Sequence, residues 1–419
     1  MYENKRELPR ALLVECDTGE DDAESSLAEL YELVRSAGAV PFGAMTQKRP
    51  SADAATCVGK GMVQQIADFC EKHHIELLIF DRELTPTQIR NLEEDTSVRV
   101  VDRTMLIMDI FACSARSREG KLQVELAQLE YLLPRLSGRG TALSRLGGGI
   151  GTRGPGETKL ETDRRHIRGR IRSLQVQLEE VEKHRQQIER RRRKDGVVTA
   201  ALVGYTNAGK STLMNALTDA GVLAEDRLFA TLDPTARALR LPNGFSVMLI
   251  DTVGLVRRLP HQLVKAFRST LEQAAQADIL LNVCDASSPE AQTHLKVTSD
   301  LLTGLGCTGK MLPVLNKCDQ VPGLTGLPQI GQGIRISAKT GEGIPNLLQA
   351  IQDALPVQVR RVQLLLPFSQ SGLAARVREQ GTVLQEKYTS EGLALEAFVG
   401  PALFPAVQPF LQTNSITKA

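Results

Sequence analysis

The sequence predicts an α/β protein with several domains, and three observations support this fold class. Strand and helix patterns alternate from Arg10 to about Ala115, which implies a parallel sheet covered by helices on both faces. From Lys121 to Lys194 the pattern is helical, with no credible strand. The apolar run Val197–Val203 then leads through a glycine-containing loop into a helix, which is typical of a doubly wound, mainly parallel sheet. A further strand pattern after Val357 predicts a small C-terminal α/β unit.

The composition is that of a chain that buries a sizeable core. Its 419 residues are 42% hydrophobic and 24% charged, which suits two or three domains. No apolar run approaches the roughly 18–20 residues that cross a bilayer, and the charged N-terminus lacks the apolar core of a signal peptide. We therefore expect a cytoplasmic protein without a membrane span, and a monomer. The seven cysteines are scattered and never spaced C-x-x-C, so we expect buried, reduced thiols in preference to metal ligands.

The N-terminal α/β domain is expected over residues 1–116. Its predicted strands cover 11–16, 39–45, 75–81 and 98–102, and its predicted helices cover 20–38, 61–74 and 85–95. The segment Gly59–Gly61 opens the second of these helices. It is the best candidate for a phosphate contact in this domain, although a plain helix start explains it better.

A helical hairpin is expected over residues 117–195, formed by helices at 121–136 and 161–194. The second helix is mostly polar and has one narrow apolar face, which we expect to pair with leucines of the first helix. The paired sets are Ile171, Leu174, Leu178, Val181 and Ile188 on one side, and Leu122, Leu126, Leu129 and Leu133 on the other.

The rest of the second helix is basic. Residues Lys159–Lys194 hold thirteen Lys or Arg against six Asp or Glu, and the run ends in Arg190–Lys194. Such a rod suits the phosphate backbone of a nucleic acid, and a solvated charged face without a ligand is the alternative. The glycine-rich stretch Leu146–Arg165 joins the two helices. We favour a tip that inserts into a crowded surface, with a second phosphate cradle or a plain linker as alternatives.

A phosphate-binding loop (P-loop) lies at Gly204–Thr212, within the domain expected over residues 196–356. The motif G-x-x-x-x-G-K-[ST] places backbone N–H groups and a helix N-terminus around an anion. Lys210 would reach the β- and γ-phosphates, and the Ser211 hydroxyl would bind Mg²⁺. The predicted nucleotide contacts in this loop are Gly204, Tyr205, Thr206, Asn207, Ala208, Gly209, Lys210, Ser211 and Thr212.

Two later motifs indicate guanine as the base. Asn316, Lys317 and Asp319 form N-K-x-D after an apolar strand, and the Asp319 carboxylate could accept two hydrogen bonds from guanine, whereas adenine offers no matching donor pair. Ser337, Ala338 and Lys339 follow a short strand, where a backbone amide could meet the guanine carbonyl oxygen. The order of these motifs predicts a site for GTP and GDP.

The switch residues follow from the same pattern. In Asp251-Thr252-Val253-Gly254, Asp251 should hold Mg²⁺ through water and the Gly254 N–H should meet the γ-phosphate. Thr231 is our choice for the threonine that closes over Mg²⁺ when the triphosphate is present, since Thr235 starts the next strand. Lys210, Thr231 and Gly254 are the catalytic candidates, and Ser211, Thr231 and Asp251 the metal candidates. The switch segment adds the predicted contacts Phe229, Ala230, Thr231, Leu232 and Asp233.

Together these strings resemble the HflX family of translational GTPases. The resemblance rests on GGGIGTRGPGETKLETDRR, which is highly specific, followed by GYTNAGKST, FATLDPTAR, DTVG, NKCD and SAK. It implies a GTPase that binds the large ribosomal subunit, splits stalled or stress-inactivated ribosomes and directs the hairpin loop toward the peptidyl-transferase centre. It also implies ATP binding and ATPase activity in the N-terminal domain, where this chain has no Walker motif. A ribosome assembly factor with incidental GTP turnover is the alternative function.

Leu255 departs from Ras-like enzymes, which place a water-orienting glutamine there. An aliphatic side chain cannot polarise water, so we expect slow intrinsic hydrolysis. Members of the resembled family usually carry phenylalanine at this position. Asn207 is a candidate for coordinating K⁺, which would substitute for an arginine finger, and simple stabilisation of the turn is the alternative. Arg257 and Arg258 are weaker candidates for an internal finger.

Overall fold

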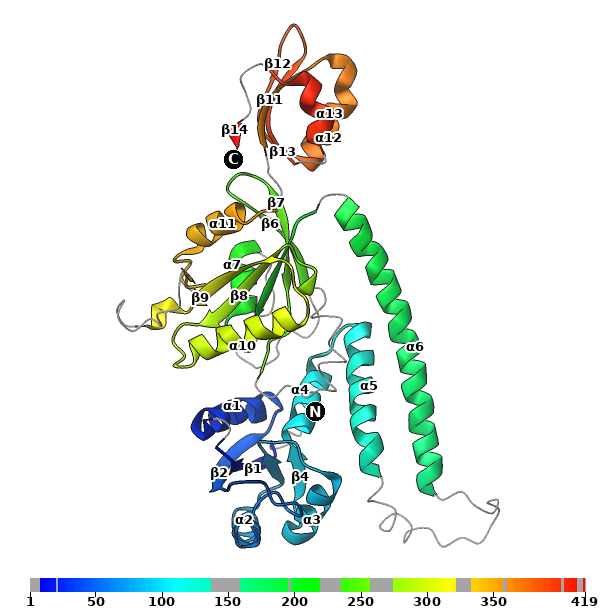
Figure 1. Ribbon diagram of the computed structural model, residues 1–419, viewed down its shortest axis with the longest axis vertical. Coiled ribbons are helices and arrows are strands. Elements are labelled where there is room, and N and C mark those ends of the chain that lie inside the picture. Colours follow the sequence, from blue (N-terminus) through cyan, green and yellow to red (C-terminus); the bar gives the residue numbers. More distant parts are fainter. Residues whose placement is uncertain are drawn as a thin grey trace, which may run out of the picture. The chain divides into compact units, whose positions relative to one another are not determined.

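The computed structural model describes residues 8–19, 22–136, 159–194, 197–218, 235–256, 274–321, 333–356, 360–400, 403–412 and 417–418 (Figure 1). The chain forms two compact units, and the division falls within one long helix. The first unit contains Met1–Glu182, Glu225–Asp233 and Val256–Arg268, and the second contains Lys183–Ala224, Pro234–Leu255 and Ser269–Ala419. The domain boundaries expected above stay predictions.

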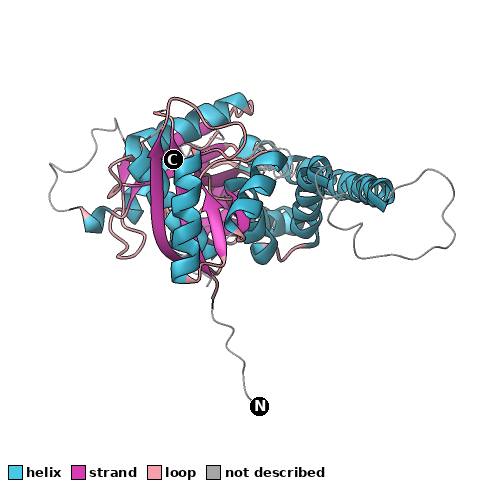
Figure 2. Cartoon of the chain, turned by 90° about the horizontal axis from the view of Figure 1, so that it is seen from below, coloured by secondary structure: helices cyan, strands magenta, loops and turns pink. Residues whose placement is uncertain are grey.

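The N-terminal domain is built on a four-stranded parallel sheet, as predicted. The strands β1 (Arg10–Asp17), β2 (Val40–Lys48), β3 (Leu77–Phe80) and β4 (Arg99–Asp102) lie in the order β2-β1-β3-β4. Helices α1 (Ala23–Ser36) and α4 (Arg103–Ser114) pack together, as do α2 (Lys60–His73) and α3 (Pro86–Thr96). Figure 2 shows helices on both sides of the strands. Leu12 and Val14 of β1 join the apolar core formed with α2 and α3. Leu13, between them, faces the other side of the sheet because strand side chains alternate.

Helix α4 is not among the helices that the sequence predicts. Its residues Leu106, Ile107, Ile110 and Phe111 are buried, together with Arg103 and Thr104 at its start. A helix that is apolar on most sides lacks the amphipathic period by which surface helices are found. It therefore escapes a search for periodicity.

The described part of the middle region forms two helices, which confirms the predicted helical region. Helix α5 covers Arg118–Arg135 and α6 covers Lys159–Lys194. Arg170 of α6 donates two hydrogen bonds to Glu125 of α5, at 2.6 and 2.8 Å. Ile171 and Leu174 are buried, whereas Ile188 is 37% exposed. Among the described residues, the burial of this apolar face thus decreases along α6, from buried Ile171 and Leu174 through half-buried Leu178 and Val181 to exposed Ile188.

The nucleotide-binding domain has a six-stranded sheet in the order β10-β9-β8-β5-β7-β6. Five strands are parallel, and β6 pairs antiparallel with β7 at one edge. This agrees with the predicted mainly parallel sheet. The strands are β5 (Thr199–Gly204), β6 (Thr235–Arg240), β7 (Ser246–Asp251), β8 (Ile279–Asp285), β9 (Lys310–Asn316) and β10 (Ile334–Arg335). The helices considered below are α7 (Lys210–Thr218), α10 (Ala291–Gly304) and α11 (Ile344–Asp353).

The C-terminal unit is a small α/β layer, as predicted. Strands β11 (Arg360–Leu366), β12 (Thr382–Tyr388), β13 (Leu393–Val399) and β14 (Thr417–Lys418) lie in the order β12-β13-β11-β14, with antiparallel pairing. Helices α12 (Ser371–Gln380) and α13 (Phe404–Val407) contribute Ala374, Val377 and Val407 to its core. Within the described parts of the chain, no helix is both long and apolar enough to span a membrane.

Candidate functional site

The P-loop connects the end of β5 to the start of α7, which is the context that the motif requires. Gly209 has φ of +85°, and a side chain there would collide with the Asn316 amide. Only glycine combines this backbone conformation with such a close approach. The loop is therefore shaped by the N-K-x-D segment as well as by its own sequence.

Lys210 is the first residue of α7 and is buried at 7% exposure. Its Nζ donates hydrogen bonds to the carbonyl oxygens of Gly204 and Tyr205, at 3.0 and 2.8 Å. Burial lowers the pKa of the Lys210 ammonium to about 8, and the nearby Asp251 carboxylate opposes this shift. The loop thus holds a cationic group beside the helix N-terminus, where a phosphate would bind.

Ser211 and Asp251 form a pair of oxygen ligands next to Lys210. The Ser211 Oγ donates to Asp251 Oδ2 at 2.9 Å, and Asp251 is fully buried at the end of β7. A hydroxyl and a carboxylate are the hard oxygen donors that Mg²⁺ prefers, and one or two protein ligands plus phosphate oxygens suffice. The donor set therefore fits a nucleotide-bound Mg²⁺ ion, which would neutralise charge on the phosphates.

Gly254 lies directly against the P-loop. A side chain on Gly254 would sit 2.6 Å from Thr206 Cγ2 and 3.1 Å from Lys210 Nζ. The following residue is hydrogen-bonded to the loop in both directions: the Thr206 N–H donates to the Leu255 carbonyl at 2.8 Å, and the Leu255 N–H donates to the Gly204 carbonyl at 3.1 Å. The segment after Asp251 thus extends across the phosphate-binding loop.

The Leu255 side chain is buried, with 5% exposure, in a small apolar cluster. It packs with Tyr205, and Leu301 and Leu305 pack against them. The Tyr205 ring stacks on His294 of α10, with ring centroids 3.9 Å apart. In this arrangement Leu255 serves as a packing residue, consistent with its inability to orient water.

The N-K-x-D residues have separate structural roles. The buried Asn316 side chain donates to the Ala208 carbonyl and accepts from the Ala338 N–H, both at 2.9 Å, so it links the P-loop to the S-A-K segment. Lys317 has φ of +62° and pairs with Asp285 at 2.7 Å. Asp319 is exposed in a short 3-10 helix, Cys318–Gln320. A carboxylate in this position is open to an incoming base.

The S-A-K segment is held by its own hydrogen bonds. Ser337 is fully buried, its N–H donates to the Glu342 carbonyl at 2.9 Å, and its Oγ accepts from the Thr340 N–H at 3.2 Å. Lys339 is exposed. The Ala338 N–H is engaged by the Asn316 side chain, which fixes this segment beside the N-K-x-D motif.

Several predicted residues lie outside the described part of the chain. These are the switch residues Phe229–Asp233, including Thr231, the candidate fingers Arg257 and Arg258, and most of the glycine-rich stretch. Thr235 does begin β6, as expected, and it pairs with Asp251 in register. Thr212 lies in the first turn of α7, and Thr252 and Val253 follow the end of β7. The Thr252 hydroxyl donates to the Leu202 carbonyl at 2.6 Å.

The sequence did not predict the roles of Asp285, His294 or the linking role of Asn316. Asp285 ends β8 without belonging to a motif, although polar residues at the carboxyl ends of parallel strands are a usable signal. The stacking of His294 on Tyr205 depends on how α10 packs, which no local pattern shows. Tertiary packing brings Asp285 to Lys317, and it brings His294 and Asn316 to the P-loop.

Among the described residues, no group of three or more Cys, His, Asp or Glu side chains could hold a metal. Cys16, Cys57, Cys70 and Cys284 are buried free thiols, whereas Cys113 is exposed.

Gly59 is the N-cap of α2, and its N–H donates to Gln47 Oε1 at 2.8 Å. This supports a plain helix start there, and a secondary ATPase activity stays a prediction.

Comparisons with known proteins cover nearly the whole chain. Three family models match: GTP-binding GTPase N-terminal over residues 24–112, GTP-binding GTPase Middle Region over 114–193, and 50S ribosome-binding GTPase over 199–317. The GTPase HflX of Caldanaerobacter subterraneus subsp. tengcongensis is 49% identical over 400 residues, which is 95% of this chain and 93% of that one. The GTPase HflX of Escherichia coli is 42% identical over 391 residues, 91% of each chain. This chain belongs to the HflX family.

Membership of the HflX family establishes the enzymatic class. The protein is a GTP-hydrolysing enzyme that binds GTP and GDP, typically with Mg²⁺, and its GTPase domain is of the ribosome-binding kind. Among solved structures, the GDP complex of a GTP-binding protein from Sulfolobus solfataricus is 26% identical. It covers 83% of this HflX chain and 98% of its own, with a TM-score of 0.45.

Proposed function

We propose that this HflX-family GTPase binds the large ribosomal subunit in its GTP state and splits stalled or stress-inactivated ribosomes. GTP hydrolysis to GDP and phosphate then allows its release. The observation that carries the proposal is the pairing of a GTPase site with a long basic helix in one chain. A bound nucleotide would control the switch segments, and the helix would supply the contact with rRNA.

The hairpin has the physical character of an RNA-binding element. Helix α6 is linked to α5 by the Arg170–Glu125 ion pair, and Ile171 and Leu174 of α6 are buried. Toward its C-terminal end Arg190 and Arg191 are exposed. Arginine side chains on an exposed helix suit a phosphate backbone, because each contact releases condensed counterions. We expect the glycine-rich stretch to approach rRNA near the peptidyl-transferase centre.

We propose for the site residues the roles that the sequence predicts. Lys210 would neutralise the β- and γ-phosphates, the Gly254 N–H would bind the γ-phosphate, and Ser211 with Asp251 would hold Mg²⁺. Thr231 would complete the metal site in the GTP state, and Asp319 would recognise guanine. K⁺ bound near Asn207 would supply part of the charge that Leu255 cannot. We also propose a monomer that works in the cytoplasm.

The alternative is a ribosome assembly factor whose GTP turnover is incidental. The burial of Leu255 favours this reading as well, since the site has no water-orienting group at that position. The two functions differ in whether the large ribosomal subunit stimulates GTP turnover.

The deciding experiment measures GTP turnover with and without purified large subunits. A tenfold or larger rise, about 1.4 kcal/mol off the barrier, supports the ribosome-splitting GTPase. Light scattering of intact ribosomes should then fall when the protein is added with a non-hydrolysable GTP analogue and stay constant with GDP. Tight GTP-dependent binding without stimulation or splitting would instead support the assembly factor.

A further inference from the structure

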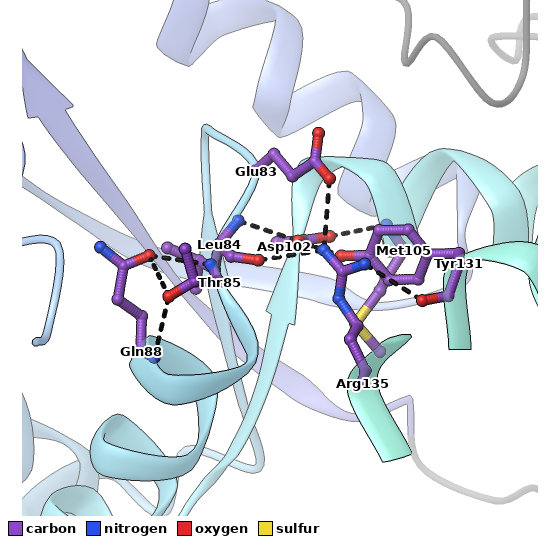
Figure 3. A network of polar contacts seen from close by, with 8 residues as sticks. All are labelled: Glu83, Leu84, Thr85, Gln88, Asp102, Met105, Tyr131 and Arg135. Carbon is purple, nitrogen blue, oxygen red and sulfur yellow. Dashed lines mark hydrogen bonds and ion pairs between the residues drawn. The ribbon is translucent and has the colours of Figure 1, made fainter. Parts of the chain in front are cut away.

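A buried polar network ties the end of α5 to the N-terminal domain (Figure 3). Its centre is Asp102, which is fully buried where β4 ends and α4 begins. The Asp102 carboxylate accepts hydrogen bonds from the Met105 N–H at 2.8 Å, from the Leu84 N–H at 3.0 Å and from the Tyr131 hydroxyl. One carboxylate thus joins three segments: the start of α4, the loop before α3, and α5.

Arg135, in the last turn of α5, completes the network. Its guanidinium lies 3.2 Å from the centre of the Tyr131 ring, and its Nη2 lies 3.8 Å from Asp102 and 3.2 Å from Glu83. The same nitrogen donates to the Leu84 carbonyl at 3.0 Å, while Nη1 donates to the Tyr131 carbonyl at 3.1 Å. Tyr131 is 2% exposed and the Arg135 side chain 14%, so both are held in place by their surroundings.

The network holds the end of α5 that leads toward α6. The first turn of α5 follows directly from α4 in the chain, so the neighbouring helix already fixes it. The opposite end, at Arg135, is the end from which the chain continues toward α6. Tyr131 and Arg135 are four residues apart, so they lie on one face of α5, toward the N-terminal domain.

We propose that Asp102, Tyr131 and Arg135 form a positioning clamp that fixes the direction of the hairpin on the N-terminal domain. This inference rests on the proposed ribosome binding by the hairpin and extends it: the N-terminal domain acts as the base that aims α5 and α6. The Arg170–Glu125 ion pair links α5 to α6 on the side chains that the two helices turn toward each other. The clamp residues need no contact with rRNA, because they act through the helix they hold.

The cost of burying the Asp102 carboxylate favours one fixed arrangement of the clamp residues. Burial raises the pKa of the Asp102 carboxyl, while Tyr131, the two amides and Arg135 lower it. Removing one of the four partners of a buried carboxylate is destabilising, because part of the desolvation of the carboxylate is then uncompensated. The network therefore favours a single arrangement of α5 over several.

The test uses the full-length protein with Tyr131→Phe, Arg135→Met and both changes together, and Lys121→Met as the control. Lys121 lies on the same helix with its side chain exposed, so its loss removes a charge without touching the clamp. Hydrogen–deuterium exchange of residues 128–136 should accelerate at least tenfold in the double variant, while β1 and β3 keep their protection. Intrinsic GTP turnover should stay within twofold of the wild type in all four variants.

Titration with large ribosomal subunits gives the readout that a merely structural role would not change. In the double variant the subunit concentration for half-maximal stimulation should rise at least fivefold, with the maximal rate within twofold of the wild type. Unchanged exchange at 128–136, equal acceleration across the whole N-terminal domain, or an unchanged half-maximal concentration would each overturn the clamp. If large subunits do not stimulate the wild type, the proposed function fails, and the exchange data alone decide whether the clamp holds α5.

Discussion

The Thr206 amide nitrogen lies 2.8 Å from the Leu255 carbonyl oxygen, so the residue at the position of the Ras glutamine is tied to the P-loop through its backbone. The side chain of Leu255 meanwhile packs with Tyr205. Both interactions direct Leu255 away from a role in orienting water. The chemistry at this site must therefore obtain that function from another group.

Replacing Leu255 by glutamine should consequently fail to restore Ras-like intrinsic hydrolysis. The glutamine amide would enter a buried apolar cluster, where an unpaired polar group costs on the order of 1–3 kcal/mol. We expect single-turnover GTP hydrolysis within threefold of the wild type and a lower thermal midpoint. Leu255→Met, which conserves volume and polarity, should keep both values close to those of the wild type. A tenfold gain in intrinsic rate by the glutamine variant would contradict the packing role.

Asn316→Ala should weaken GTP and GDP equally. Its side chain joins Ala208 to Ala338, so its loss leaves a carbonyl and an amide without a partner in a buried place. Each such group costs about 1–3 kcal/mol, which predicts a loss of affinity of roughly 30-fold or more. Titration calorimetry with both nucleotides measures the effect.

Lys317→Met provides the contrast for Asn316→Ala. Its ion pair with Asp285 is about a fifth exposed on each side, at 22% and 23%. Partly exposed pairs contribute about 1 kcal/mol or less, so the affinity should fall no more than about fivefold. Equal losses in the two variants would show that Asn316 does not have the linking role assigned to it.

Asp319→Asn should change the base preference of the site from guanine toward xanthine. The carboxylate is suited to the N1–H and the exocyclic amine of guanine, whereas an amide nitrogen can donate to the second carbonyl of xanthine. We expect GTP to bind at least tenfold more weakly and XTP to bind more tightly than it does to the wild type. Competition between labelled GDP and XTP measures the switch. If both nucleotides bind the variant as they bind the wild type, Asp319 does not contact the base.

The motifs predict a nucleotide site because each combines a chemical need with a local fold. The glycine at 209, the lysine at 210 and the strand before them specify one turn, and that turn forms. The partners of that turn could not be predicted in the same way. Asn316 and His294 reach the loop from elements about 110 and 90 residues away, and only the packing of β9 and α10 brings them there.

In the N-terminal domain, too, local patterns predicted the main elements but not the contacts between them. The alternation of strands and helices predicted its sheet, whereas α4 was missed because its apolar residues do not follow one stripe. Tyr131 belongs to a helix that the sequence does predict, but its polar partner Asp102 lies in another element. Periodicity identifies which face of a helix is buried, and it carries no information on which polar group lies opposite that face.

Binding of GDP at alkaline pH should take up protons because of Lys210. Burial lowers its pKa to about 8 in the free protein, so most molecules have lost this proton at pH 8.5. Between about pH 8 and the ordinary lysine pKa of 10.5, the unfolded chain binds more protons than the folded protein. The free energy of unfolding therefore rises with pH over this range, and this gain is lost as the pH falls through about 8. A bound diphosphate favours the charged ammonium and reverses the shift.

Calorimetry of GDP binding in two buffers with different ionisation enthalpies measures this uptake. At pH 8.5 we expect about half a proton or more per nucleotide, and at pH 6.5 almost none, since Lys210 is then already charged. Lys210→Arg should abolish the uptake, because the guanidinium stays protonated throughout this range. An uptake that persists in the arginine variant would have to come from another group.

Replacing Arg190, Arg191 and Arg192 by alanine tests whether the end of α6 contacts rRNA. If it does, binding to large subunits should weaken, and the slope of log affinity against log salt should become shallower by about 0.7–0.9 for each phosphate that the variant no longer neutralises. Arg90→Ala, on α3 with a half-exposed side chain, should leave the slope unchanged. Alanine favours a helix, so α6 should persist and intrinsic GTP turnover should not change. A weaker affinity with an unchanged slope would mean that these arginines contact a neutral surface, and the hairpin would then bind the ribosome through its other residues.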